Sequence, residues 1–286
     1  TQCQALIVAN PVSSHAQSIQ WALDRNIHLL VEKPFVHSAL LGRDILANNQ
    51  SQTVVNVVQN WRAKSAALAA KQFIASEKFG KAGQIFFQYI RNRENPKLPD
   101  YLFQEKSPLL YAVGIHHIDL FQYILQDTIC SVQGSSFKPS WSRYQDDSGV
   151  NLTMTTERGC TIIYTGTFSS QNTILPNESW ILEGEKGTLL SESRSCEPPL
   201  WFIDKDSQDK IDLTAEITER TEPEQFNLAD QTILRNFYDT IAGNEDALCS
   251  VSDAVQTLGV LEAVVQACET GQKVLVEKIK SEIQFY

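Results

Sequence analysis

Two groups of polar residues in this sequence have side chains suited to moving a proton. The first is Glu32-Lys33-Pro34, which directly follows an apolar run. An ammonium group at the mouth of a crevice can hydrogen-bond a substrate hydroxyl and help move its proton when the alcohol carbon loses hydride. A lysine without such a context is usually a solvated surface charge. The Lys33–Pro34 bond is also a candidate for a cis peptide, because cis bonds favour X-Pro in tight turns.

The second group is Gly114-Ile115-His116-His117-Ile118-Asp119, in an otherwise apolar stretch that is predicted to be helical. Imidazole titrates near neutral pH and is the commonest acid/base group in catalysis. His116 and Asp119 are three residues apart, so we expect them to share one face of the helix. A core histidine with a hydrogen-bond partner is the alternative. Adjacent histidines diverge on a helix, so we predict no metal site.

The elements that must position these residues begin as strands alternating with helices. Apolar runs at 5–9, 28–31 and 53–58 are predicted strands, with helices from about Ser13 and over 38–49. This order is typical of parallel βαβ units, and the first run is predicted to be buried on both faces. Such sheets bind ligands beyond the carboxyl ends of their strands. Those ends carry Asn10, Glu32-Lys33-Pro34 and Asn60-Trp61-Arg62, although polar turns end most strands.

The pattern then changes to helices at 66–78 and 109–125, a strand at 84–93, and a run of strands between 131 and 213. Two helices close the chain, the last with a capping box at Ser250 and Asp253 and a C-terminal Gly271. We predict an α/β fold class. Residues 1–62 form the C-terminal portion of a Rossmann (parallel sheet) domain, and residues 63–286 form an α+β domain with an open, mostly antiparallel sheet for substrate binding and oligomerisation.

Composition excludes several classes of function. The 286 residues have a formal net charge of −10, which argues against a nucleic-acid partner. No apolar run reaches the roughly 18 residues that a membrane span needs. The six cysteines form no CxxC pair and are expected to be reduced. We therefore expect a cytoplasmic protein whose partner is a small molecule.

These motifs together resemble the glucose-fructose oxidoreductase, inositol dehydrogenase and rhizopine catabolism protein (Gfo/Idh/MocA) family. The resemblance runs through nearly the whole chain, and its specificity lies in the order and spacing of five pieces. They are Ala9-Asn10-Pro11 with His15, Val31-Glu32-Lys33-Pro34, Gly114-Ile115-His116 with Asp119, the turn 183–189, and the two C-terminal helices.

The resemblance implies an enzyme that uses NAD or NADP, and hydride transfer between nicotinamide and a hydroxyl or keto group of a sugar, polyol or related small molecule. It implies Lys33 and His116 as catalytic residues and a homodimer or homotetramer. A non-catalytic ligand-sensing or regulatory protein on the same fold is the alternative. The cofactor-binding residues that it implies are Asn10, Pro11, His15, Glu32, Lys33, Trp61 and Arg62.

The sequence departs from the family pattern in two places. Family members begin with a strand and a GxGxxG loop, whereas this chain opens on what resembles the fourth strand. We therefore expect about 60 to 70 residues to precede it, the size of two βαβ units, and weak dinucleotide binding by the chain alone. Many family enzymes also have an aspartate four residues before the catalytic histidine, where this sequence has Ala112. Both departures favour the sensor, whereas Lys33 with His116 favours the enzyme.

Overall fold

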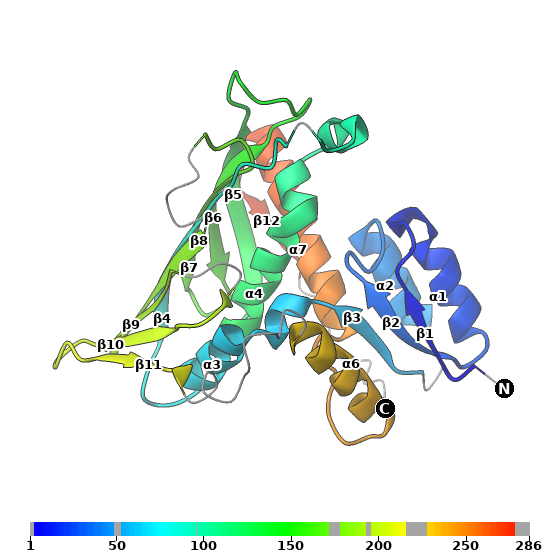
Figure 1. The fold of residues 1–286 in the computed structure, drawn as a ribbon, viewed down its shortest axis with the longest axis horizontal. Coiled ribbons are helices and arrows are strands. Elements are labelled where there is room, and N and C mark those ends of the chain that lie inside the picture. The colour runs from blue at the N-terminus through cyan, green and yellow to red at the C-terminus, as the bar shows by residue number, and fades with distance from the viewer. Residues whose placement is uncertain are drawn as a thin grey trace.

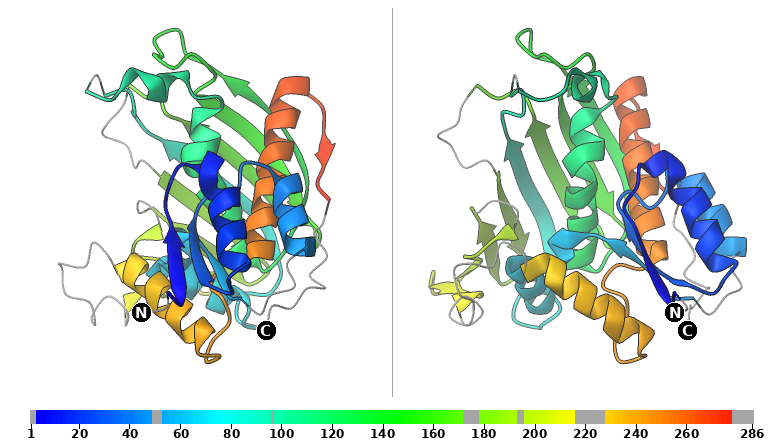
Figure 2. Two further views of the ribbon diagram at one scale, coloured as in Figure 1. Left: turned by 90° about the vertical axis from the view of Figure 1, so that its right-hand side faces the viewer. Right: turned by 45° about the vertical axis from the view of Figure 1, so that its right-hand side comes forward.

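The structure, a computed structural model, describes residues 3–48, 53–95, 97–171, 178–192, 196–215 and 228–277. It contains a three-stranded sheet in the order β1-β2-β3 and a nine-stranded sheet in the order β11-β10-β9-β8-β4-β7-β6-β5-β12. The small sheet and helices α1 and α2 lie at one side of the molecule, and helices α4 and α7 separate them from the large sheet (Figures 1 and 2). The α/β fold class is confirmed.

The small sheet is parallel and contains β1 (Ala5–Val8), β2 (His28–Glu32) and β3 (Val55–Val58), linked by α1 (His15–Leu23) and α2 (Ala39–Asn48). The middle strand β2 is buried, as predicted. The prediction that the first strand is buried on both faces is wrong. Its Val8 packs in the same cluster as Ile19 of α1, but Ile7 on the opposite face is 57% exposed. The described residues leave that face of β1 open.

The large sheet is mixed rather than purely antiparallel. Its strands are β4 (Ala82–Ile90), β5 (Ile129–Phe137), β6 (Gly149–Thr156), β7 (Thr161–Thr167), β8 (Glu178–Gly184), β9 (Gly187–Ser191), β10 (Trp201–Asp204), β11 (Lys210–Asp212) and β12 (Val274–Leu275). Neighbouring strands are antiparallel except β4 and β7, which run parallel. The predicted hairpin is present as β6 and β7, with Gly159 at φ +90° in its turn. Glycine suits that turn because its backbone adopts positive φ without a Cβ clash.

Four further helices are described: α3 (Ser65–Ile74), α4 (Ile115–Leu125), α6 (Leu228–Ile241) and α7 (Val251–Thr270). A single π-helical turn, Leu110–Gly114, leads into α4. The predicted cap of α7 is present, because Ser250 Oγ accepts from the backbone N–H of Asp253 and the Asp253 carboxylate accepts from that of Ser250. Gly271 ends the helix at φ +67°, also as predicted.

The core lies between the large sheet and the two long helices. The inner residues of β4 (Ile85, Phe87 and Tyr89) pack in one cluster with Phe121 of α4 and Leu261 of α7. The alternate residues of the central strands face outward. This packing fixes α4, and therefore His116, relative to the sheet. No helix in the described part of the chain is long and apolar enough to cross a membrane.

Candidate active site

Lys33 extends from the end of β2 to the start of the helical segment that carries His116. Its Nζ donates to the backbone carbonyl of Ala112 at 2.9 Å and lies 3.5 Å from that of Tyr111. Both carbonyls belong to the π-helical turn before α4, and such turns occur often at functional sites. The ammonium group of Lys33 therefore meets neutral backbone carbonyls in this turn. The Lys33–Pro34 peptide bond is cis, as predicted.

His116 is held by the segment that follows β3. Its Nδ1 lies 2.7 Å from Oε1 of Gln59, which is itself buried. The imidazole stacks on Trp61, with ring centroids 5.8 Å apart and planes 6° from parallel. With the amide oxygen of Gln59 facing Nδ1, that nitrogen carries the proton and Nε2 keeps its lone pair. The arrangement therefore leaves Nε2 as the atom that can accept a proton from a ligand.

Burial and two cations control the protonation of this site. Burial lowers the pKa of His116 to about 3, and the charges of Lys33 and Arg93 act in the same direction. The pKa of Lys33 is also lowered, first by burial, while Glu32 opposes the shift and Arg93 adds to it. At neutral pH the imidazole is therefore neutral, and a pKa this far below neutrality makes it a weak base.

His117, the neighbour of His116, points into the core. It is fully buried, its Nδ1 lies 2.9 Å from the hydroxyl oxygen of Tyr164, and its ring packs on Trp61, Phe87 and Tyr89. Burial lowers its pKa well below the usual value. The two histidines thus diverge, one toward Gln59 and one into the sheet. In the described ranges no group of three or more His, Cys, Asp or Glu side chains could hold a metal ion.

His15 joins the end of β1 to the turn that carries Lys33. Its Nε2 lies 2.8 Å from the carbonyl oxygen of Asn10, and its Nδ1 lies 3.1 Å from the carbonyl oxygens of Pro34 and Phe35. The side chain is buried at the start of α1. Asn10 itself is exposed, and its amide donates to Ser18 Oγ. Pro11 beside it is also exposed, so this strand end presents one polar and one apolar side chain to solvent next to the Lys33 turn.

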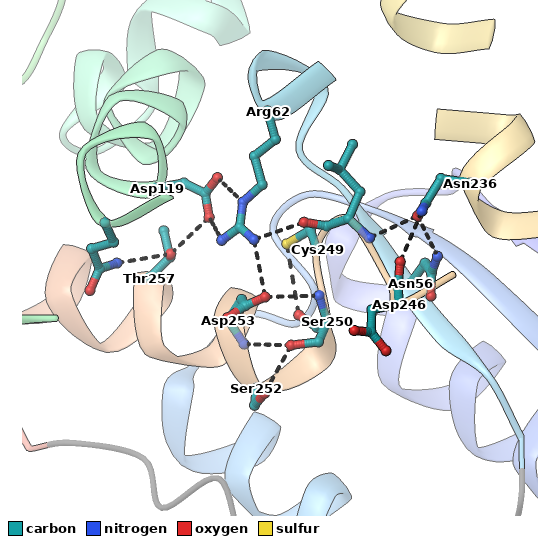
Figure 3. Close-up of polar contacts among 12 residues, drawn as sticks. Asn56, Arg62, Asp119, Asn236, Asp246, Cys249, Ser250, Ser252, Asp253 and Thr257 are labelled. Carbon is teal, nitrogen blue, oxygen red and sulfur yellow. Dashed lines mark hydrogen bonds and ion pairs between the residues drawn. The ribbon is translucent and has the colours of Figure 1, made fainter. Parts of the chain in front are cut away.

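Arg62 and Asp119 form a buried, bidentate ion pair (Figure 3). Arg62 Nε and Nη2 each lie 2.7 Å from a different oxygen of Asp119. Arg62 Nη1 also donates to the Leu248 carbonyl and to Asp253. Burial alone would lower the pKa of Arg62, but the Asp119 carboxylate holds it well above the usual value. The pair joins the segment after β3 to α4 and α7.

His116 and Asp119 share one helix face, as predicted, because both meet the segment that contains Gln59 and Arg62. The structure thus places Lys33 against the turn that leads into α4, and Trp61 against His116 on that helix. Glu32 lies beside Lys33, and the backbone N–H of Lys33 donates to the Glu32 carboxylate at 3.0 Å. Arg62 faces Asp119 and Asp253, with 5% of its surface exposed.

Sequence reasoning missed two residues of this site, Gln59 and Arg93. Gln59 comes directly before Asn60-Trp61-Arg62 at the third strand end, so the strand-end rule could have included it. Arg93 follows β4, and nothing local in the sequence connects it to Lys33 or His116. Its charge nevertheless acts on both.

The sequence matches the model of a protein family described as "Oxidoreductase family, C-terminal alpha/beta domain" over residues 71–276. Three curated relatives match. The protein y4oX of Sinorhizobium fredii is 22% identical over 65% of this chain and 53% of its own length. The oxidoreductase YhhX of Escherichia coli is 29% identical over 40% of this chain and 33% of its own. The oxidoreductase YrbE of Bacillus subtilis is 23% identical over 96% of this chain and 78% of its own length. The chain thus spans only about half of y4oX and a third of YhhX.

Solved structures share the fold. An oxidoreductase from Agrobacterium radiobacter, in complex with NAD+, L-tartaric acid and magnesium, has a TM-score of 0.81 at 17% identity, covering 95% of this chain and 80% of that one. An inositol dehydrogenase homolog from Azotobacter vinelandii, with NADH and myo-inositol, has a TM-score of 0.79 at 18% identity, covering 95% and 78%. A levoglucosan dehydrogenase with NADH and levoglucosan has a TM-score of 0.81 at 18% identity, covering 96% and 81%. Because the family model matches well over half of the sequence, this chain belongs to the Gfo/Idh/MocA oxidoreductase family.

Proposed function

We propose that this chain forms part of an NAD(P)-dependent oxidoreductase that transfers a hydride between nicotinamide and a hydroxyl or keto group of a sugar, polyol or related small molecule. The observation that carries the proposal is the meeting of Lys33 with the segment that carries His116, at the carboxyl end of a parallel sheet. An ammonium group and a neutral imidazole that face the same substrate can share one substrate oxygen and its proton.

The residues at the strand ends fit a dinucleotide. Parallel sheets bind such ligands at this edge, and here Asn10, Pro11 and Glu32 present polar or exposed groups beside Lys33. Asn60 adds an unused acceptor, because its buried Oδ1 has no hydrogen-bond partner among the described residues. An amide or ribose donor of the cofactor would satisfy it. Bound there, the nicotinamide would supply or accept the hydride. Neighbours with this fold were solved with NAD+ or NADH.

Each residue then has a defined task. Lys33 donates a hydrogen bond to the reacting oxygen, with its carbonyl contacts to the π-helical turn fixing its direction. His116 Nε2 takes the hydroxyl proton as the carbon loses hydride, and Gln59 holds the opposite nitrogen. Trp61 supports the imidazole from one side, and His15 holds the Lys33 turn. We assign Arg62 to the scaffold of the cofactor site, since its guanidinium is engaged by carboxylates.

We further propose the domain division 1–62 and 63–286 and a homo-oligomer formed through the open face of the large sheet. Phe86 of β4 is 42% exposed and lies directly beside Ile163 and Ile181 of the flanking strands, which are also exposed. These three side chains form an apolar row across the sheet. Exposed apolar patches of this kind mark association surfaces.

A ligand-sensing or regulatory protein is the second candidate. Ala112 favours it, because no carboxylate stands four residues before His116 to raise the basicity of the imidazole. The two candidates differ in turnover, since a sensor would bind cofactor or sugar without exchanging hydride.

The experiment compares Lys33→Met with the wild type, in protein expressed from the complete reading frame. Lys78→Met, at an exposed lysine after α3, is the matched control. NAD+ and NADP+ reduction is followed by the absorbance of the reduced nicotinamide with a panel of sugars and polyols, and NADH binding by fluorescence. We expect Lys33→Met to lower kcat by about a hundredfold or more while NADH affinity changes little. Binding without turnover in the wild type would support the sensor, and unchanged turnover in Lys33→Met would remove Lys33 from the mechanism.

A further inference from the structure

Two cationic side chains meet the candidate site without an ion-pair partner. In the part of the chain that the structure describes, neither Lys33 nor Arg93 has a carboxylate oxygen within ion-pair distance. Lys33 uses its ammonium on two neutral backbone carbonyls. Cations that are removed from water are usually paired, so the partly buried Lys33 without a carboxylate indicates a place for an anion. The exposed Arg93 adds a second charge nearby, because it stacks on Phe168, and Phe168 packs near Tyr89, which contacts His117 next to His116.

Arg93 is fixed in place by its backbone and an aromatic ring. Its N–H donates to the carbonyl of Phe168 at 2.8 Å, and the guanidinium carbon lies 5.0 Å from the centre of the Phe168 ring. The side chain remains exposed. A guanidinium that stacks on a ring keeps its N–H edge free, and that edge matches a carboxylate or phosphate in a bidentate pair.

The neighbouring acids leave this edge available. The Glu94 carboxylate accepts from the Ser169 hydroxyl and from the backbone N–H of Arg143. Glu32 accepts from the backbone N–H of Lys33 on the cofactor side. Glu32 and the exposed Glu105 act on Lys33, where they oppose the fall of its pKa.

Among the charges that act on His116, no carboxylate raises its pKa in the way that Glu32 and Glu105 raise that of Lys33. Besides burial, the charges that act on it are those of Lys33 and Arg93, and both lower its pKa. If this imidazole takes a proton from a substrate, a third cation forms beside the two already present. A negative charge on the substrate would offset that repulsion and make His116 a better base, because an opposite charge nearby favours the charged form.

We propose that the substrate carries an anionic group, a carboxylate or a phosphate, which the guanidinium of Arg93 binds while the reacting hydroxyl lies between Lys33 and His116. The inference rests on the proposed function and narrows its substrate class to acidic sugar derivatives. In the oxidation of the substrate, the hydride goes to the cofactor and the hydroxyl proton goes to His116. The anionic group takes no part in either transfer and is unchanged.

The test uses matched substrates that differ by one charged group: D-gluconate against D-glucitol, D-glucuronate against D-glucose, and D-glucose 6-phosphate against D-glucose, each with NAD+ and with NADP+. We expect at least one charged member to have a kcat/KM at least about tenfold above that of its neutral partner, the value of one charge-assisted hydrogen bond. Comparing the two carboxylate pairs with the phosphate pair identifies which anion is bound.

Arg93→Gln should remove this preference, because it should raise KM for the charged member by about tenfold or more relative to KM for its neutral partner. Arg143→Gln is the matched control, because its guanidinium also stacks on an aromatic ring, Phe103, but pairs with Asp100. A neutral partner preferred by the wild type, or a charged preference that survives Arg93→Gln, would overturn the inference.

A second readout does not depend on turnover. Ring-nitrogen NMR of His116 follows its titration with and without the preferred anion. The anion should raise the pKa of His116 from about 3 in the wild type and in Arg143→Gln, and the effect should be absent in Arg93→Gln. If no substrate is oxidised but the anion still raises the pKa of His116, the proposed function fails and the anion site stands. If neutral sugars are oxidised and no anion raises the pKa of His116, the proposed function stands and the inference of an anionic substrate fails.

Discussion

The Nδ1 atom of His116 lies 2.7 Å from Oε1 of Gln59, although the two residues are 57 positions apart. This contact decides which nitrogen of the imidazole keeps a free lone pair. Because Gln59 is buried, water cannot replace its amide oxygen without a cost. The protonation chemistry of the site therefore depends on a residue from the end of β3 as well as on α4.

Replacing Gln59 separates positioning from chemistry. In Gln59→Leu the Nδ1–H of His116 loses its acceptor, so we expect the ring to shift toward the other tautomer and kcat to fall about tenfold to a hundredfold. Gln59→Glu should instead raise the pKa of His116, because a carboxylate favours the imidazolium. Ring-nitrogen NMR and the pH profile of kcat measure both effects. A tautomer identical to wild type in Gln59→Leu would show that the contact has no positioning role.

The Arg62–Asp119 pair should matter mainly to stability. Removing one partner leaves an uncompensated buried charge, so Arg62→Met or Asp119→Leu should lower the free energy of unfolding by about 3–5 kcal/mol. The double variant should lose less than the sum of the two, because neither charge is then left alone. Urea unfolding of all four proteins measures the coupling. Additive losses would mean that the two side chains do not stabilise each other.

The buried histidines should make stability depend on pH. The pKa of His116 is about 3 in the folded chain against 6.5 when unfolded. Between these values the unfolded state takes up a proton that the folded state refuses, so stability is fully present above pH 6.5 and falls as the pH is lowered. From about pH 7 to about pH 5 this histidine contributes a loss of about 2 kcal/mol.

His117 acts in the same direction, since its pKa is also lowered. Urea unfolding at about pH 7 and about pH 5 measures the total loss. His116→Gln should reduce the loss, whereas His37→Gln, at an exposed position, should leave it unchanged. An equal loss in wild type and His116→Gln would mean that His116 titrates normally in the folded chain.

The apolar row on the large sheet predicts self-association. Phe86→Glu places a charge beside Ile163 and Ile181, and should shift the protein toward smaller species by light scattering without lowering its melting temperature. Gln133→Glu, on the exposed face of β5 away from this row, is the control. A wild type that is monomeric at high micromolar concentration would contradict the proposed interface.

Local signals in the sequence determined much of the fold. Ser250 and Asp253 capped α7, Gly159 turned the β6–β7 hairpin, and apolar periodicity marked the helices and most of the strands. These features depend on residues within a few positions of each other, so their spacing alone carries the information. The motif around Lys33 and Pro34 likewise predicted the cis bond that the structure contains.

Tertiary packing decided the rest. The exposure of Ile7 depends on what covers β1, and the parallel pairing of β4 with β7 depends on a strand inserted between hairpins. The contacts of Lys33 with Ala112, and of Gln59 with His116, join residues 57 to 79 positions apart. No local propensity encodes such a contact, because it exists only once two sheets and a helix have packed around a shared core.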